Sequence, residues 1–181
     1  LHGEASLEDV LGAVAGDRAT AVRSPIISCP SGNAYAGLLA GPGTAWSDVR
    51  EAMRENAVLN LAQSTVAAIA ETLGGAGVLC RQPPFGLREG YPLILLNAQD
   101  NGIVALAYHA QTPGDYLAQA FALLRRDFRR GPHDVLGIAR EVTLASSDGA
   151  PFGLLLDGEP ADAGARCTFR LVRSEVDLLA T

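Results

Sequence analysis

In the first part of the chain, apolar residues recur at helical spacing in some segments and at strand-like spacing in others. Ser6 precedes a short amphipathic stretch with Asp9 three residues later, the spacing of a capping box, and Gly16 follows it. A helix is therefore expected to begin after Ser6 and to end at Gly16. The next elements expected are strands over 21–29 and 34–40 and a helix over 45–73.

The rest of the chain is dominated by short apolar runs bounded by turn residues. Strands are expected over 78–82, 93–97, 103–109, 135–145, 152–156, 167–172 and 176–179, and a helix over 113–128. Asp100-Asn101-Gly102 has the composition of a hairpin turn. Strands and helices do not alternate regularly, which disfavours a parallel sheet. The pattern predicts a mainly β fold with inserted helices (α+β), an antiparallel β-sandwich.

Composition narrows the class of protein. The chain has 181 residues, 48% of them hydrophobic, and a net charge of -6. A chain of this length and hydrophobic content is expected to bury an ordinary core without disulfides or metals. The negative net charge argues against nucleic acid as a partner. All basic residues are Arg, so no Lys serves as a Schiff base or in a phosphate-binding loop. The first five residues contain no Met, and we expect the chain to be part of a longer protein.

The cysteines and histidines do not suggest a metal centre. Cys29, Cys80 and Cys167 are far apart in apolar segments, which predicts buried thiols and a reducing compartment. The three histidines have no ligand spacing. The Arg cluster within 125–130 fits a solvated helix end or a contact with anionic lipid.

Candidate chemistry concentrates in Leu154–Pro160, where an apolar strand leads into Asp157-Gly158-Glu159. A carboxylate fixed at a strand end is suited to general-base catalysis, because the strand holds it while one side stays open. The same residues also fit a plain hairpin turn. Asp100 offers a single carboxylate to a cation, which is few for magnesium.

Together these segments resemble the C-terminal domain of the bacterial diacylglycerol kinase-like lipid kinases, relatives of the sphingosine kinases. Leu1-His2-Gly3 and the helix after Ser6 resemble the segment that leaves the family's nucleotide-binding domain. The other matching segments are the strand over 35–40 with Gly41-Pro42-Gly43, the Asp100-Asn101-Gly102-Ile103 turn, and Leu156-Asp157-Gly158-Glu159-Pro160 with the strands after it.

The resemblance implies that residues 1–181 form the β-rich C-terminal domain of a lipid kinase, with an N-terminal α/β nucleotide-binding domain outside this chain. Glu159 matches the glutamate proposed as proton acceptor for the lipid hydroxyl, with Asp157 beside it as a second catalytic candidate. Asp100 matches one carboxylate of the metal-binding turn, and Asn101 replaces the second. ATP and magnesium are then cofactors of the intact protein, and neither is expected to bind this chain tightly.

Implied partners are the protein's own nucleotide-binding domain and a diacylglycerol-like lipid at a membrane surface. The implied location is the cytoplasm, with peripheral attachment to the inner face of the membrane as an alternative. A homodimer is a further possibility. Two other functions compete with the kinase hypothesis. One is a stand-alone β-rich module for a small apolar ligand, and the other is a regulatory domain of a degenerate kinase.

Overall fold

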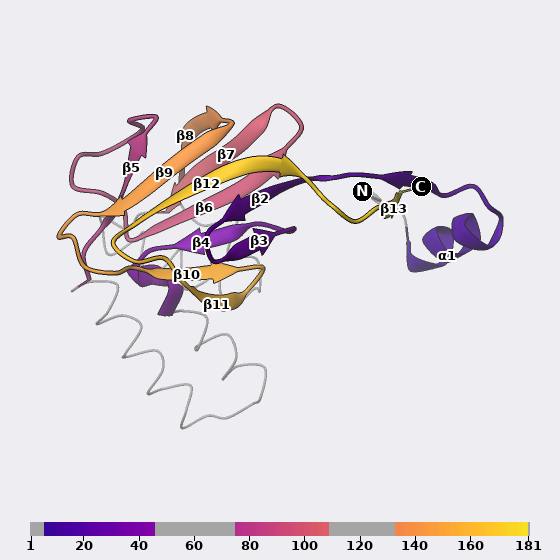
Figure 1. Cartoon of the computed structure of the whole chain (residues 1–181), viewed down its shortest axis with the longest axis horizontal. Coiled ribbons are helices and arrows are strands. Elements are labelled where there is room, and N and C mark those ends of the chain that lie inside the picture. Colours follow the sequence, from indigo (N-terminus) through magenta and orange to yellow (C-terminus); the bar gives the residue numbers. More distant parts are fainter. Residues whose placement is uncertain (1–5, 46–74, 109–132, 181) are drawn as a thin grey trace, which may run out of the picture.

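The computed structural model describes residues 6–45, 75–108 and 133–180 (Figure 1). These residues contain thirteen strands, one α-helix and one short 3-10 helix, η1 (Pro42–Ala45). Every strand pair is antiparallel. The fold is therefore mainly β, as predicted, and most strands belong to two large sheets that form a sandwich (Figure 1).

The first sheet has six strands. In order across the sheet they are β11 (Glu159–Asp162), β10 (Gly153–Leu156), β4 (Leu38–Ala40), β6 (Leu93–Gln99), β7 (Gly102–Tyr108) and β8 (His133–Ala139). The second sheet has five strands, in the order β3 (Gly32–Ala34), β2 (Pro25–Cys29), β12 (Arg166–Arg173), β9 (Glu141–Ser146) and β5 (Val78–Gln82).

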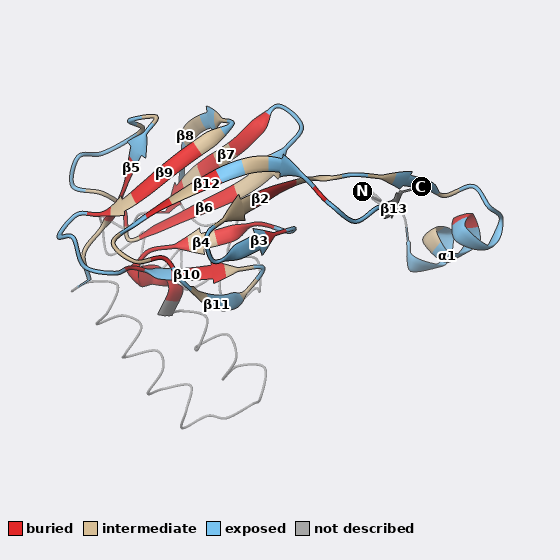
Figure 2. Ribbon diagram, in the orientation of Figure 1, coloured by how far each residue is buried: buried red, intermediate tan, exposed pale blue. Residues whose placement is uncertain are grey.

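The core lies between these two sheets (Figure 2). It takes aliphatic and aromatic side chains from both, and the central members are inaccessible to water: Phe169, Val142 and Leu144 from the five-stranded sheet, and Ile94, Leu96 and Ile103 from the six-stranded sheet. Burial of such side chains is the main favourable contribution to folding. We therefore expect this core to be the main source of the stability of the sandwich.

A third, two-stranded sheet leaves the sandwich as an arm. It pairs β1 (Thr20–Val22) with β13 (Leu178–Ala180), and α1 (Leu7–Ala15) lies beyond it (Figure 1). The predicted capping box of α1 is confirmed, because Ser6 Oγ accepts from Asp9 N at 3.2 Å and Asp9 Oδ2 accepts from Ser6 N at 3.0 Å. We use "the arm" below for β1, β13 and α1.

Each of three apolar runs for which the sequence predicts one strand forms two strands in the structure. The segment 21–29 forms β1 in the arm and β2 in the sandwich, and 135–145 forms β8 and β9 in different sheets. The run 34–40 is interrupted at Gly37, where the chain passes from one sheet to the other. Gly37 has φ +134°, which side chains with a Cβ rarely adopt, and a Cβ there would lie 3.0 Å from the Leu96 carbonyl oxygen and 2.5 Å from Asn97 Oδ1, so the crossing favours glycine.

The strand β11 (Glu159–Asp162) is not among the strands expected from the sequence, because proline lacks the N–H that a central strand needs. Pro160 instead lies opposite Leu155 on the edge strand of the sheet. Proline is tolerated on an edge strand, where no further strand needs its missing N–H. The helices expected over 45–73 and 113–128 fall, from residue 46 on, outside the described residues. No helix among the described residues has the length and apolar content required to cross a lipid bilayer.

Candidate functional site

The Asp157-Gly158 turn connects β10 to β11. Leu156 pairs with Glu159, so the loop between the two strands contains only two residues. Both have positive φ, 52° at Asp157 and 97° at Gly158, as the common two-residue hairpin turn with a left-handed backbone requires. The hairpin interpretation of these residues is thus correct for their backbone. It leaves open what the two carboxylates do.

The Asp157 carboxylate accepts hydrogen bonds from three successive backbone N–H groups. Its Oδ2 lies 2.8 Å from Tyr35 N, and its Oδ1 lies 2.7 Å from Ala36 N and 3.1 Å from Gly37 N. The Asp157 N–H in turn donates to the Gly37 carbonyl at 3.0 Å. Hydrogen bonds to an ionised acceptor are stronger than neutral ones. Asp157 therefore ties the hairpin to the crossing between β3 and β4, and its lone pairs are largely engaged.

Glu159 is the other carboxylate of the hairpin, and its surroundings differ. It is exposed at the start of the edge strand β11, and its side chain has no hydrogen bond or ion pair with another described residue. Residues directly opposite on antiparallel strands share a face of the sheet. Glu159 is opposite Leu156, which packs against the core, so its side chain belongs to the core-bearing face at the open edge of the sandwich. It is a carboxylate beside aliphatic surface, and no described residue engages either of its oxygens.

Asp100 lies in the two-residue turn between β6 and β7, as the sequence predicted, because Gln99 pairs with Gly102. Its Oδ1 is 2.9 Å from Nη1 of Arg173, at the end of β12. The side chain of Asp100 is 82% exposed and that of Arg173 is 58% exposed. The one carboxylate that the sequence offered to a cation is thus paired with a guanidinium.

The turns at Asp100 and Asp157 lie at the same end of the six-stranded sheet but not together. Leu156 pairs with Leu38, and Leu38 with Leu96, so β10 and β6 run in the same direction and both end at this side. Glu159 is three strands away from β6, which corresponds to about 14 Å across the sheet. Metal–oxygen bonds are about 2.0–2.6 Å long, so one ion does not bridge Asp100 and Glu159.

No other grouping of ligand side chains supplies a metal centre in the part of the chain that the structure describes. Within it, no three or more His, Cys, Asp or Glu residues are placed to hold an ion. Cys80 and Cys167 are buried, as predicted, and Cys29 is half-buried. Burial raises the pKa of the Cys167 thiol to about 12, with the neighbouring Cys29 adding to the effect. A thiol protonated to this degree is a poor nucleophile and metal ligand.

Sequence reasoning missed the groups that act on the two predicted aspartates. The backbone N–H groups of residues 35–37 are more than a hundred residues from Asp157, and Arg173 is 73 residues from Asp100. Neither partner has a local motif. A weak signal existed at Asp157, since aspartate accepts the left-handed backbone and also offers a carboxylate to nearby N–H groups.

No known protein-family model matches this sequence, and no curated protein matches it. The case for a function therefore rests on the geometry of the hairpin and on the resemblance of the sequence segments.

Proposed function

We propose that this chain is the C-terminal domain of an ATP-dependent kinase that phosphorylates the hydroxyl group of a diacylglycerol-like lipid. The observation that supports it is the division between two carboxylates on one hairpin. Asp157 accepts from three N–H groups, whereas Glu159 is exposed and its carboxylate is bound by none of the residues that the structure describes. A general base requires a defined position and a free oxygen; strand pairing with Leu156 holds the Glu159 backbone, and no described residue binds its carboxylate.

In the proposed reaction, a Glu159 oxygen accepts the proton of the lipid hydroxyl. The hydroxyl oxygen attacks the γ-phosphorus of ATP, the new P–O bond forms, and the bond to the β-phosphate oxygen breaks, releasing ADP. Phosphoryl transfer depends mainly on positioning and on charge stabilisation of the nucleotide phosphates. The ATP and its magnesium would be held by a nucleotide-binding domain outside this chain.

The surroundings of Glu159 fit a lipid hydroxyl better than a soluble sugar or nucleotide hydroxyl. Leu156 is its cross-strand neighbour and Ala161 follows it on the same face, and both pack against the core. An aliphatic surface beside the carboxylate favours an apolar substrate that presents a single hydroxyl. The proposal implies action in the cytoplasm at the surface of a membrane, and it leaves open whether the protein dimerises.

The test compares two isosteric variants in the full-length protein that carries this chain. Glu159→Gln is expected to lower lipid phosphorylation by about 10²- to 10⁴-fold, the usual effect of losing a positioned general base. Asp157→Asn is expected to lower it far less, because that carboxylate supports the hairpin. Phosphorylation is measured with radiolabelled ATP and diacylglycerol in mixed micelles.

ATP affinity and the thermal midpoint are measured for both variants. Retained ATP binding with lost turnover in Glu159→Gln supports the assignment. Near-normal turnover in that variant contradicts it and reduces Glu159 to an ordinary hairpin residue. If the wild-type protein binds ATP but phosphorylates no lipid, the regulatory alternative is favoured; if it binds a small apolar ligand without ATP, the binding-module alternative is favoured.

A further inference from the structure

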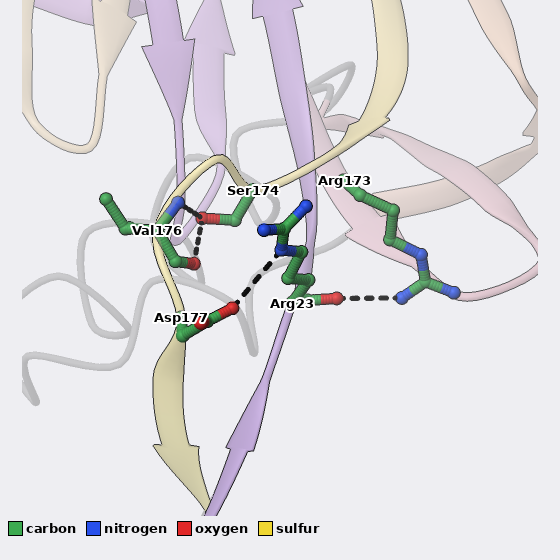
Figure 3. A network of polar contacts seen from close by, with 5 residues as sticks. All are labelled: Arg23, Arg173, Ser174, Val176 and Asp177. Atoms are coloured by element: carbon green, nitrogen blue, oxygen red, sulfur yellow. Dashed lines mark hydrogen bonds and ion pairs between the residues drawn. The ribbon is translucent and has the colours of Figure 1, made fainter.

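The arm joins the sandwich at two strand junctions that lie side by side (Figure 3). One junction is Arg23-Ser24, between β1 and β2, and the other is Ser174–Asp177, between β12 and β13. Arg173 pairs with Pro25 at the last register position of the sandwich. Any change in the direction of the arm must therefore bend the backbone at these junctions, which we call the arm root.

Ser174 fixes one side of the arm root. It is 1% exposed, and its N–H donates to the Ser24 carbonyl at 2.9 Å. Its hydroxyl accepts from Val176 N at 3.1 Å and donates to the Val176 carbonyl at 2.7 Å (Figure 3). The chain turns out of the sheet here around a single buried hydroxyl whose donor and acceptor are both used.

Arg173 joins three separate segments at the same place. From β12, its Nη1 donates to the Arg23 carbonyl at 3.1 Å and to Asp100 Oδ1 at 2.9 Å. Nη1 carries two hydrogens, so it makes both bonds at once. A second ion pair, Arg23 Nε to Asp177 Oδ1 at 3.2 Å, crosses between the two strand junctions (Figure 3).

The donor set at the Asp100 turn does not fit the divalent cation that the family resemblance implies. Asn101 offers no carboxylate, and Asp100 is already paired with a guanidinium. Magnesium requires six oxygen ligands in near-octahedral geometry, and the described residues place no group of three or more acidic, His or Cys side chains together. The positive charge at this turn belongs to Arg173.

We propose that the Arg173 guanidinium acts at the Asp100 turn as a built-in cation, and that the Asp100–Arg173 contact restrains bending of the arm at its root. Asp100 extends from the β6–β7 hairpin, which belongs to the other sheet, so the contact ties the arm root to both sheets of the sandwich. The proposal concerns the chain itself and does not depend on the kinase function.

The magnitude of the restraint follows from the exposure of the pair. An exposed ion pair contributes little free energy to the conformation that it stabilises. Here that contribution corresponds to about a 1.5- to fivefold change in the equilibrium between the fixed and the bent arm. The pair is also screened by salt. The expected change in arm bending is therefore small and confined to the arm. Detecting it requires a measurement that reports on arm residues separately from sandwich residues.

The experiment measures amide hydrogen exchange by NMR on the full 181-residue chain. Arg173→Gln and Asp100→Asn are expected to accelerate exchange of the β1 and β13 amides by about 1.5- to fivefold relative to the sandwich amides. The double variant is expected to match Arg173→Gln alone, because Asp100 acts through Arg173. Molar salt is expected to move the wild type towards the variants. Magnesium or excess EDTA is expected to change nothing.

Arg170→Gln is the matched control. Arg170 also lies on β12 and is also ion-paired on the surface, to Glu141 at 2.7 Å, but it does not contact the arm root. Its loss is expected to leave arm exchange unchanged. If the β1 and β13 amides exchange at the wild-type rate in Arg173→Gln, the Asp100–Arg173 contact does not restrain the arm. Slower arm exchange on adding magnesium, abolished by Asp100→Asn, would overturn the built-in cation and restore a metal site. If the exchange results are as expected but the wild-type full-length protein phosphorylates no lipid, only the proposed function is refuted.

Discussion

Removal of the Asp157 carboxylate is expected to lower the stability of the chain by an amount that can be worked out group by group. Three N–H groups lose their acceptor in Asp157→Ala. Tyr35 and Ala36 are exposed, so water replaces the carboxylate there at little cost. Gly37 is buried, and an unsatisfied buried N–H costs about 1–3 kcal/mol.

The backbone conformation of residue 157 adds a second contribution. Its φ is 52°, in the left-handed region, which costs an alanine about 1–2 kcal/mol and costs a glycine almost nothing. Asp157→Ala should therefore lose about 2–5 kcal/mol in all, and Asp157→Gly about 1–3 kcal/mol, because it loses only the acceptor. Asp157→Asn keeps one oxygen and suits the turn, so we expect a loss of about 1 kcal/mol.

Urea denaturation of the full chain measures these values, with the slope of the transition checked for constancy. Glu159→Gln is the control on the same hairpin and should change stability by less than about 0.5 kcal/mol, because the exposed Glu159 side chain makes no polar contact with the described part of the chain. Equal stability of Asp157→Ala and the wild type would show that the carboxylate does not hold the 35–37 crossing. Equal losses in Asp157→Ala and Asp157→Gly would show that the left-handed backbone is not costly there.

Two further predictions test the core and the crossing. The Cys167 pKa is raised from 9.0 to about 12 in the folded chain, so the folded state favours the protonated thiol; this contribution is complete below pH 9 and is lost as the pH rises towards 12. The urea midpoint should fall more steeply above pH 9 in the wild type than in Cys167→Ala, and equal slopes would contradict the buried thiol. Gly37→Ala should destabilise the chain by more than about 2 kcal/mol, because positive φ and a blocked Cβ position combine. Gly149→Ala, with φ +79° and open space around its Cβ, should cost only about 1–2 kcal/mol in the same denaturation assay. A similar loss in both would contradict the close contact with Asn97.

The elements that the sequence predicted best are those whose signals are local. The capping box at Ser6 and Asp9 involves residues three positions apart, and the Asp100-Asn101 turn is flanked by strands that pair with each other. In both cases the partners are adjacent in the chain. A pattern of neighbouring residues contains the information that determines such structures.

The features that sequence analysis could not predict depend on distant partners. Nothing in the apolar run 34–40 shows that its two ends belong to different sheets, because that depends on Leu38 pairing with Leu96 and Ile27 with Ala34. The order of strands also decides that β11 is an edge strand and accepts Pro160. Strand propensity describes only the segment itself, so neither outcome is visible in it.

At the candidate site, too, the sequence predicted the local turn but not the distant groups that contact it. The sequence named Glu159 as the expected proton acceptor and Asp157 as a second candidate on the same turn, and it gave no sign of the three N–H groups from residues 35–37 that bind Asp157. The three hydrogen bonds engage both Asp157 oxygens with the backbone of the crossing. Asp157 is thus suited to hold the turn and poorly suited to act as a base. Stability should follow Asp157 and catalysis should follow Glu159, and a variant set in which both properties change together at one position would contradict this division.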